Sequence, residues 1–292
     1  MSLMEKGTVD RWAIGVAGAL ADVTELVFPQ PCAVCGRGNR ALCPVCRAFF
    51  VRLTAAPGNV ADSLPRWPSE VPCIAAGGYG HEVARAILAF KTGYRMDVSA
   101  DLSRALGRSV DFLVERYVRE RESGHLATTG EAARSVHLVP APSRAAAFRK
   151  RGFVPGEVLA RKVARRRRAG SWGRDLPMLK VEASVRLREP LMDRVTGSRR
   201  LSSSGQKGLT AGRRFDRIHG AMYVARSLSD FRRTGGPSLA GKSCILIDDV
   251  ATTGSTLGEM KRAIEDAGGH VLAAAVVASV RAPSEKLHEN LQ

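Results

Sequence analysis

One stretch of the chain, residues 242–267, constrains the fold more than any other. Its apolar run from Cys244 to Ile247 has the composition of a fully buried parallel strand. From Ser255 onward, apolar side chains recur at helical spacing as far as Ala267, and two glycines then end the helical pattern. The sequence therefore predicts a buried strand, a short turn and a helix in direct succession.

Two adjacent carboxylates, Asp248 and Asp249, lie between this strand and this helix, and a turn of small and hydroxyl side chains follows at 252–256. A helix N-terminus carries unpaired N–H groups and partial positive charge, so such a turn suits a phosphate. The carboxylates would repel that phosphate, but they match sugar hydroxyls or a bound cation. Together these features describe a ribose 5-phosphate site. An ordinary strand-to-helix turn with capping Ser and Thr side chains is the alternative.

The unit resembles the phosphoribosyl pyrophosphate (PRPP) loop of type I phosphoribosyltransferases. The resemblance implies that Asp248 and Asp249 are catalytic residues that hold the ribose hydroxyls. It also implies that the 5′-phosphate is bound by the residues that follow, which are Ala251, Thr252, Thr253, Gly254, Ser255 and Thr256.

The chain is strongly basic, and the excess is concentrated in one segment. Its 292 residues carry 45 Lys and Arg against 28 Asp and Glu, a net charge of +17. Residues 144–217 hold 21 basic and six acidic side chains. Such a segment suits nucleic acid or a polyanionic small molecule, and it equally suits a solvated surface. The sequence leaves both readings open.

No apolar run reaches the roughly 18 to 20 residues of a membrane span. Acidic residues interrupt the apolar stretch near the N-terminus, which argues against a signal peptide. Trp12, Val16, Leu20, Val23 and Val27 instead form one helical stripe, so residues 9–28 are predicted as an amphipathic helix that docks on the body of the protein. We expect a cytoplasmic protein without membrane insertion.

Four cysteines fall within fifteen residues in the pattern CxxC-x7-CxxC. They are Cys32, Cys35, Cys43 and Cys46. Two cysteines three positions apart can direct both thiolates to one point, and two such pairs supply four ligands for tetrahedral zinc. Gly36 and Gly38 provide the backbone freedom that a tight knuckle needs. We predict a structural Zn²⁺ site with no open position for catalysis. Disulfides are the alternative, which the lack of a secretory signal disfavours.

A basic loop is predicted at 143–153, directly after a strand candidate at 136–139. Arg side chains in such a loop can match the charge of a pyrophosphate with paired donors. The alternative is a solvated basic turn that leads into a helix. Elsewhere the pattern predicts a proline-rich linker at 54–72 and a short strand and turn at 72–81. Long helical stretches are predicted at 82–118 and 157–168, and loops at 119–135 and 169–182. Two further strands are predicted at 221–225 and 270–280.

The segment Gly236 to Ser243 satisfies the Walker A pattern letter for letter. A P-loop must follow a strand and open a helix, so that its amides point at phosphate. Here the match follows a polar loop and runs straight into the strand that begins near Cys244. The order of elements therefore excludes a P-loop NTPase.

Most of the chain, roughly residues 26–280, resembles the ComF-type competence-protein family of phosphoribosyltransferase-like proteins. The motifs that carry this resemblance are Phe28-Pro29 before the cysteine pairs, Phe90-Lys91 with Gly93, Val139 to Pro142 with Arg149 and Arg151 to Phe153, then Gln206, Leu209 and Arg214, and finally Ile247 to Thr256. The chain departs from the family at Val154-Pro155, where Asn-Gln is usual, and at Arg217, where Asn is usual. Both departures lie in segments expected to border the substrate, so the resemblance does not specify the acceptor.

The resemblance implies an α/β protein with a type I phosphoribosyltransferase fold, a mostly parallel twisted sheet flanked by helices, and a small N-terminal zinc ribbon with four cysteine ligands. The expected parts are an N-terminal helix, the ribbon, the phosphoribosyltransferase-like domain and a flexible tail, at 1–30, 31–56, 73–282 and 283–292. The residues implied to bind the leaving pyrophosphate are Lys91, Arg144, Arg149 and Arg151.

The expected function is binding of PRPP with Mg²⁺ and transfer or exchange of phosphoribosyl groups with an unidentified acceptor. The alternative is a non-catalytic protein that binds a phosphoribosyl ligand, or a basic adaptor in DNA uptake or processing. For the adaptor, the expected partners are single-stranded DNA or a DNA-processing helicase.

Overall fold

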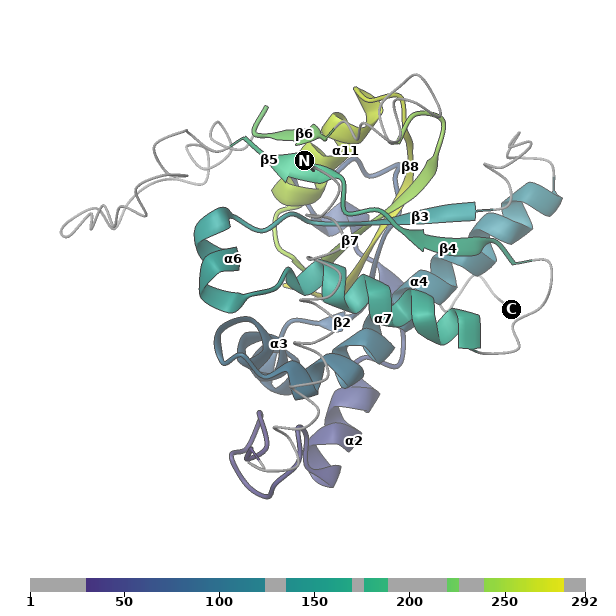
Figure 1. Ribbon diagram of the computed structural model, residues 1–292. Helices are drawn as coiled ribbons and strands as arrows, with labels where there is room; N and C mark the ends of the chain where they lie inside the picture. Colours follow the sequence, from purple (N-terminus) through teal and green to yellow (C-terminus); the bar gives the residue numbers. More distant parts are fainter. Residues whose placement is uncertain (1–29, 124–134, 170–175, 189–219, 226–238, 281–292) are drawn as a thin grey trace.

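In the computed structural model, the described residues are 30–123, 135–169, 176–188, 220–225 and 239–280. Within them, a six-stranded sheet has helices on both faces, and two further strands form a hairpin (Figure 1). The strands are β1 (Gly58–Asn59), β2 (Cys73–Gly78), β3 (Ser135–Pro140), β4 (Met178–Val181), β5 (Val185–Leu187), β6 (Met222–Val224), β7 (Ser243–Ala251) and β8 (His270–Ser279). The helices are α2 (Pro44–Leu53), α3 (His81–Thr92), α4 (Ser99–Glu122), α6 (Ala145–Arg151), α7 (Pro155–Ala169) and α11 (Ser255–Glu265), with short 3-10 turns η1 (Ala61–Ser63) and η2 (Met96–Val98).

The order of strands across the sheet is β1-β2-β8-β7-β3-β4. The five strands from β2 to β4 pair in parallel, and β1 pairs with β2 in the antiparallel sense. Helix α7 connects β3 outward to β4 over one face, whereas α11 connects β7 outward to β8 over the other. The chain thus leaves the neighbouring strands β7 and β3 in opposite directions. Open parallel sheets bind ligands at such a point, beyond the carboxyl ends of the strands.

Side chains of β7 alternate between two apolar layers, as the pleat of a strand requires. Ile245 and Ile247 belong to the layer under α4 and α7. Cys244 and Leu246 belong to the layer under α11. All four are buried, which explains why the sequence shows a continuous apolar run rather than an alternating one.

The α/β fold predicted from the sequence is confirmed, including the strands near 73–78, 136–139, 222–224 and 270–279. The predicted boundary at the central strand was too early. Strand β7 does not end at Ile247 but continues through both aspartates to Ala251, because its pairing with β8 extends that far.

Three other predictions need correction. The basic loop predicted at 143–153 is largely helix α6, since its Ala residues favour a helix that Gly152 ends with a φ of 77°. Within the loop predicted at 169–182, β4 adds a parallel strand beside β3. The proline-rich linker predicted at 54–72 is packed into the protein, with Leu64 and Trp67 buried against the α11 side of the sheet.

Several predicted features lie outside the described residues. They are the N-terminal amphipathic helix, the C-terminal tail and the family positions Gln206, Leu209, Arg214 and Arg217. Among the helices that the structure describes, none is both long enough and apolar enough to cross a membrane.

Candidate functional site

The two aspartates occupy the end of β7 where the strand projects past its neighbour. Pairing between β3 and β7 stops at Pro140 and Ile247, whereas pairing between β7 and β8 continues to Ala251. The aspartates therefore lie beside the point where the chain leaves β3 and β7 in opposite directions. Because successive side chains of a strand alternate, Asp249 belongs to the face covered by α3 and α4, and Asp248 to the face covered by α11.

Asp249 is buried and pairs with a lysine from α3. The Lys91 Nζ lies 2.7 Å from the Asp249 Oδ1, and the Asp249 side chain is only 4% exposed. An aromatic contact fixes the end of α3 from which this lysine projects: the rings of Phe90 and Phe153 lie 5.1 Å apart, centre to centre. The structure thus brings together two segments that are separate in sequence, Phe90-Lys91 and the Arg151-Gly152-Phe153 turn.

Asp248 is the most strongly perturbed carboxyl group of the site. Burial and the neighbouring charge of Asp249 raise the pKa of Asp248 to about 8, and the ammonium group of Lys91 offsets only part of this effect. The Asp249 N–H donates to the Asp248 Oδ1 at 2.8 Å and fixes its orientation. A carboxylate that is disfavoured in this way is stabilised by a cation or by donating hydroxyl groups, the two partners that the sequence indicates.

The turn that follows β7 leads directly into α11. Gly254 is the N-cap residue, with a φ of 80° that favours glycine, and its carbonyl accepts the Gly258 N–H at 2.8 Å. The hydroxyl groups of Thr253 and Ser255 lie 2.7 Å apart, and the Ser255 N–H points at the Thr253 Oγ1 at 3.4 Å. Hydroxyl and amide groups therefore converge at the helix N-terminus, an arrangement suited to an anion.

The basic residues after β3 lie at the same edge of the sheet. Arg144 is the N-cap residue of α6, and Arg149 and Arg151 lie in its last turn. Because β3 and β7 are neighbouring parallel strands, their carboxyl ends open on the same side, and Figure 1 shows α6 and α3 on that side. Arg144 and Arg149 are exposed, and Arg151 is half-buried.

A segment that the sequence did not associate with the site packs on the turn before α11. The Arg66 N–H donates to the Thr253 carbonyl at 3.0 Å, and the Arg66 Nη1 lies 3.5 Å from the Ser255 Oγ. Trp67 beside it is 5% exposed and donates to the Val71 carbonyl at 2.6 Å. The signal that could have indicated this contact was the pair of glycines at 254 and 258, which permits close approach of another backbone.

The β5–β6 hairpin is attached to α11 by a buried carboxylate. Glu259 accepts the Met222 N–H at 3.0 Å and pairs with Arg262 at 2.7 Å, and the Arg262 Nη2 donates to the Met222 carbonyl at 2.9 Å. Burial raises the pKa of Glu259, but the Arg262 guanidinium and the hairpin amides outweigh it and lower the pKa below its ordinary value. The hairpin is thereby held beside the helix that opens at the candidate phosphate turn.

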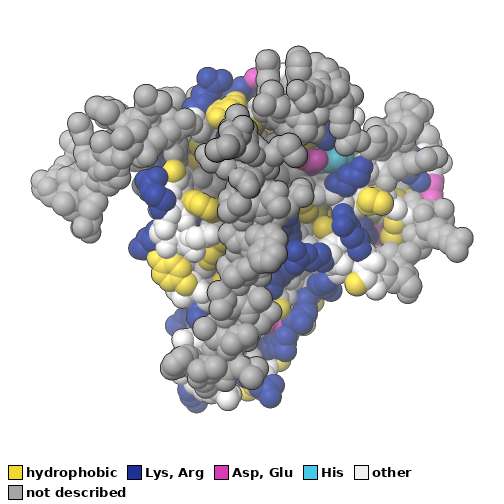
Figure 2. All heavy atoms as spheres, in the orientation of Figure 1, with side chains coloured by type: hydrophobic (Ala, Val, Ile, Leu, Met, Phe, Trp, Pro, Cys, Tyr) yellow, Lys and Arg dark blue, Asp and Glu magenta, His cyan; other side chains and the backbone are white. Residues whose placement is uncertain are grey.

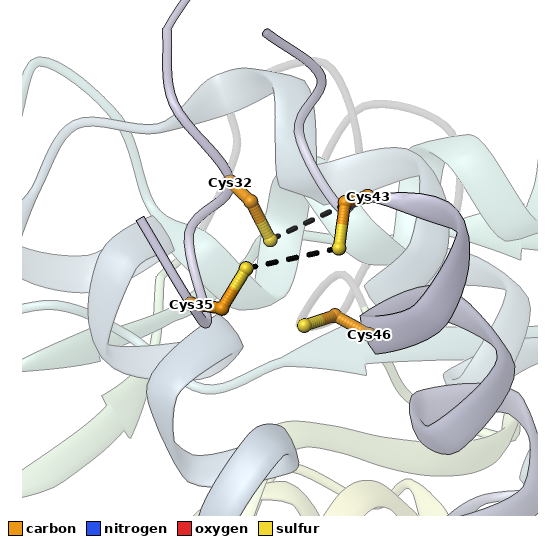
Figure 3. Close-up of side chains that lie close together, drawn as sticks. All are labelled: Cys32, Cys35, Cys43 and Cys46. Carbon is orange, nitrogen blue, oxygen red and sulfur yellow. Dashed lines mark hydrogen bonds between the residues drawn. The ribbon is translucent and has the colours of Figure 1, made fainter. Parts of the chain in front are cut away.

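The four cysteines converge at the start of α2 (Figure 3). Their Sγ atoms all lie within 4.8 Å of one another, and those of Cys35 and Cys43 are 3.7 Å apart. Tetrahedral zinc with Zn–S bonds near 2.3 Å requires Sγ atoms about 3.8 Å apart, whereas a disulfide requires about 2.05 Å. The donor set and its spacing therefore fit a metal ion.

Backbone geometry supports this cluster. Gly36 and Gly38 have φ angles of 72° and 76°, which confirms the predicted role of glycine in the knuckle. The Cys43 N–H points at the Cys32 Sγ at 3.3 Å. Burial raises the pKa of Cys32, but amide donors that include those of Cys35 and Cys43 outweigh it and lower the pKa to about 6. The thiolate is the form that binds metal.

Comparison with known proteins agrees with the geometry of the β7–α11 unit. Residues 150–290 match the family model for a phosphoribosyl transferase domain. The matched residues contain α7, β7 and α11, whereas β2, α3 and the Arg66 segment precede them. Over 44 residues the chain is also 50% identical to the transcriptional regulator GfcR of Methanocella arvoryzae. That match covers 15% of this chain and 21% of the regulator, so the similarity spans about a fifth of its length.

Proposed function

We propose that the protein binds PRPP together with Mg²⁺ and transfers or exchanges its phosphoribosyl group with an acceptor. The observation that carries this proposal is the placement of Asp248 and Asp249 on the projecting end of β7, immediately before the turn that opens α11. The phosphoribosyl transferase domain match at 150–290 includes this unit and supports the same reading.

Each part of the site has a role in this proposal. The two aspartates accept hydrogen bonds from the ribose hydroxyls and hold Mg²⁺, which supplies charge neutralisation to the pyrophosphate. The 5′-phosphate accepts hydrogen bonds from the last residue of β7, the turn and the first residues of α11, namely Ala251, Thr252, Thr253, Gly254, Ser255 and Thr256. The leaving pyrophosphate is neutralised by basic side chains, namely Lys91, Arg144, Arg149 and Arg151.

In the reaction, the bond between the ribose C1 and the pyrophosphate oxygen breaks, and its electron pair leaves with the pyrophosphate. The ribose passes through an oxocarbenium-like state, and the acceptor then forms the new bond to C1. The protein contributes mainly by holding donor and acceptor in place and by stabilising charge as it develops. The negative charges of Asp248 and Asp249 stabilise the positive ribose.

The ion pair between Lys91 and Asp249 is the contact that ligand binding would have to rearrange. The ammonium group lies 2.7 Å from the carboxylate and partly neutralises the two aspartates. With Mg²⁺ bound at the two aspartates, the Lys91 ammonium group would be available for the pyrophosphate. This exchange reconciles the pyrophosphate role inferred for Lys91 with the position that its side chain occupies.

A PRPP titration tests the binding proposal. We expect PRPP with Mg²⁺ to raise the melting temperature of the full chain, and we expect the double variant with Asp248→Ala and Asp249→Ala to lose this shift. Asp266→Asn is the matched control, since it replaces an exposed carboxylate at the far end of α11, and it should keep the shift in melting temperature. Absence of any shift in the wild-type protein at millimolar PRPP would contradict the proposal. Release of pyrophosphate in the presence of a panel of nucleobases then tests transfer.

A second candidate function is binding without transfer, as a regulator or as a basic adaptor for single-stranded DNA or a DNA-processing helicase. Two observations favour it: the match to a transcriptional regulator, and the gathering of basic side chains along α7 and toward α2 (Figure 2). Arg165, Arg166 and Arg168 on α7 are exposed. Binding to single-stranded DNA should weaken steeply with salt and should survive loss of both aspartates, which separates this candidate from the first.

We further propose that the four cysteines hold structural Zn²⁺, which orders the segment before α2. Four thiolate ligands fill a tetrahedral site, so no catalytic role is assigned to this metal. Metal analysis of the purified full chain should give about one zinc per chain, whereas less than half a zinc per chain would contradict the assignment.

A further inference from the structure

The segment that leads from η1 to Trp67 lies directly on the turn before α11. Leu64 and Trp67 are buried in the same apolar layer as Leu257 and Met260 of the helix. The Arg66 N–H donates to the Thr253 carbonyl at 3.0 Å, so the backbone of this segment is fixed to the turn. The segment is therefore part of the wall of the candidate phosphate site, although about 190 residues separate it from that site in sequence.

Two glycines make this approach possible. A Cβ at Gly254 would lie 2.8 Å from the Trp67 Cβ, and a Cβ at Gly258 would lie 2.7 Å from the Arg66 carbonyl oxygen. Both distances are shorter than van der Waals contact allows, and the second involves a backbone oxygen. The turn and the first turn of α11 are thus shaped to receive this segment as well as a ligand.

The contact places a guanidinium group at the helix N-terminus. The Arg66 Nη1 lies 3.5 Å from the Ser255 Oγ, the hydroxyl group that also meets the Thr253 Oγ1 at 2.7 Å. The guanidinium group and the positive end of the helix would both attract an anion bound between them. The planar guanidinium group can give two parallel hydrogen bonds to a phosphate, which a lysine cannot do.

We propose that Arg66 is a phosphate-binding residue of this site and that it completes the binding of the 5′-phosphate from outside the phosphoribosyl transferase domain match. The inference rests on the proposed function and deepens it. The turn supplies amide and hydroxyl groups, and Arg66 supplies the positive charge that these neutral donors lack. The 5′-phosphate site is then assembled from two parts of the chain, residues 61–67 and residues 251–256.

Two probes and three variants test this assignment in the full chain. Ribose 5-phosphate carries the phosphate that Arg66 binds, and pyrophosphate with Mg²⁺ does not occupy that position. By isothermal titration calorimetry, we expect Arg66→Gln to weaken ribose 5-phosphate binding by ~10-fold or more, the loss typical of a charge-assisted hydrogen bond. We expect pyrophosphate affinity to change less than about twofold, because no contact with it is removed. Arg66→Lys should fall between wild type and Arg66→Gln.

The matched control is Arg161→Gln, which removes a guanidinium group that pairs with Glu157 on α7, away from the turn. It should leave both affinities unchanged. Equal weakening of both probes by Arg66→Gln would show a structural role and overturn the proposal. If Arg66→Gln does not fold, Arg66→Lys decides: a selective loss for ribose 5-phosphate supports the proposal, and unchanged affinity overturns it.

The experiment separates this inference from the proposed function. If the wild-type protein binds PRPP and ribose 5-phosphate, and Arg66→Gln binds ribose 5-phosphate equally well, the role of Arg66 is wrong and the proposed function stands. If the wild-type protein binds none of these ligands, the proposed function fails, and the role of Arg66 fails with it.

Discussion

Replacing Asp248 by asparagine should stabilise the ligand-free protein while it removes binding of PRPP with Mg²⁺. The raised pKa of Asp248 means that the folded protein disfavours its charged form, chiefly because the group is buried and lies beside Asp249. Asparagine has the same shape, carries no charge and keeps the oxygen that accepts the Asp249 N–H at 2.8 Å. The variant therefore removes the electrostatic penalty and preserves the local hydrogen bond.

The pKa shift gives both the sign and the size of the effect. The pKa of Asp248 is about 8 in the folded chain. The ordinary pKa of an aspartate, 3.8, is taken as its value in the unfolded chain. Between these values the folded state holds a proton that the unfolded state has released, so stability falls as pH rises. The penalty is absent below pH 3.8 and complete above pH 8. At pH 7 its upper limit is about 4 kcal/mol, at about 1.4 kcal/mol for each pKa unit.

Water reaches part of the Asp248 side chain and screens its charge, so the measured gain should be smaller than this limit. We expect Asp248→Asn to raise the free energy of unfolding by about 1–3 kcal/mol at pH 7 and by little near pH 4. Urea denaturation of both proteins between pH 4 and pH 8 measures the difference. Asp266→Asn, whose carboxylate is exposed, should change stability by less than about 0.5 kcal/mol at any of these pH values. A variant less stable than wild type at pH 8, or a difference independent of pH, would refute the reasoning.

Three further predictions follow from contacts around the site and from the cysteine cluster. Lys91→Gln should lower the free energy of unfolding, measured by urea denaturation, by about 1–3 kcal/mol, because Asp249 is left buried without its cation. Lys261→Gln, which removes the lysine of an exposed ion pair, should lower it by about 0.5 kcal/mol or less. Equal effects of the two variants would contradict the argument from burial. Gly254→Ala should lower the melting temperature more than Gly241→Ala does. Both glycines have positive φ angles, but only at Gly254 would the added Cβ meet another segment, at 2.8 Å from the Trp67 Cβ. The reverse order of melting temperatures would exclude packing as the cause. Chelation of zinc should lower the melting temperature of the full chain, and unchanged melting with all metal removed would show that the cysteines contribute no stability through a metal ion.

The sequence was sufficient to predict the elements whose local pattern and burial agree. The apolar run before Asp248 and the helical spacing after Ser255 predicted β7 and α11, because both elements are buried in the way that their composition suggests. The cysteine spacing predicted the cluster, since two turns of fixed geometry suffice to bring four thiol groups together. These predictions depend on short stretches of chain, where periodicity and turn chemistry are informative.

Contacts between distant segments could not be predicted in the same way. The Lys91–Asp249 pair depends on the length and direction of α3, and the contact of Trp67 with Gly254 depends on how residues 61–67 pack beside α11. Prolines in residues 54–72 suggested a linker, but apolar side chains between them bury the segment. Likewise, β4 is a strand because it pairs with β3 and not because its four residues have strong strand preference.

The position of the site at the edge of the sheet explains why its residues come from both halves of the chain. The carboxyl ends of β7 and β3 are neighbours, but the connections from them diverge, so neither connection can cover the space between them. Elements that precede β3 also supply residues to this space, and Lys91 on α3 and Arg66 before β2 are two such residues. The domain match at 150–290 therefore holds the carboxylates and the phosphate turn but not these two cations. A fragment that begins at residue 150 would keep the anionic groups and lose Lys91 and Arg66, which would otherwise offset their charge. For this reason the full chain, and not the matched domain alone, is the unit in which the proposed binding of PRPP should be measured.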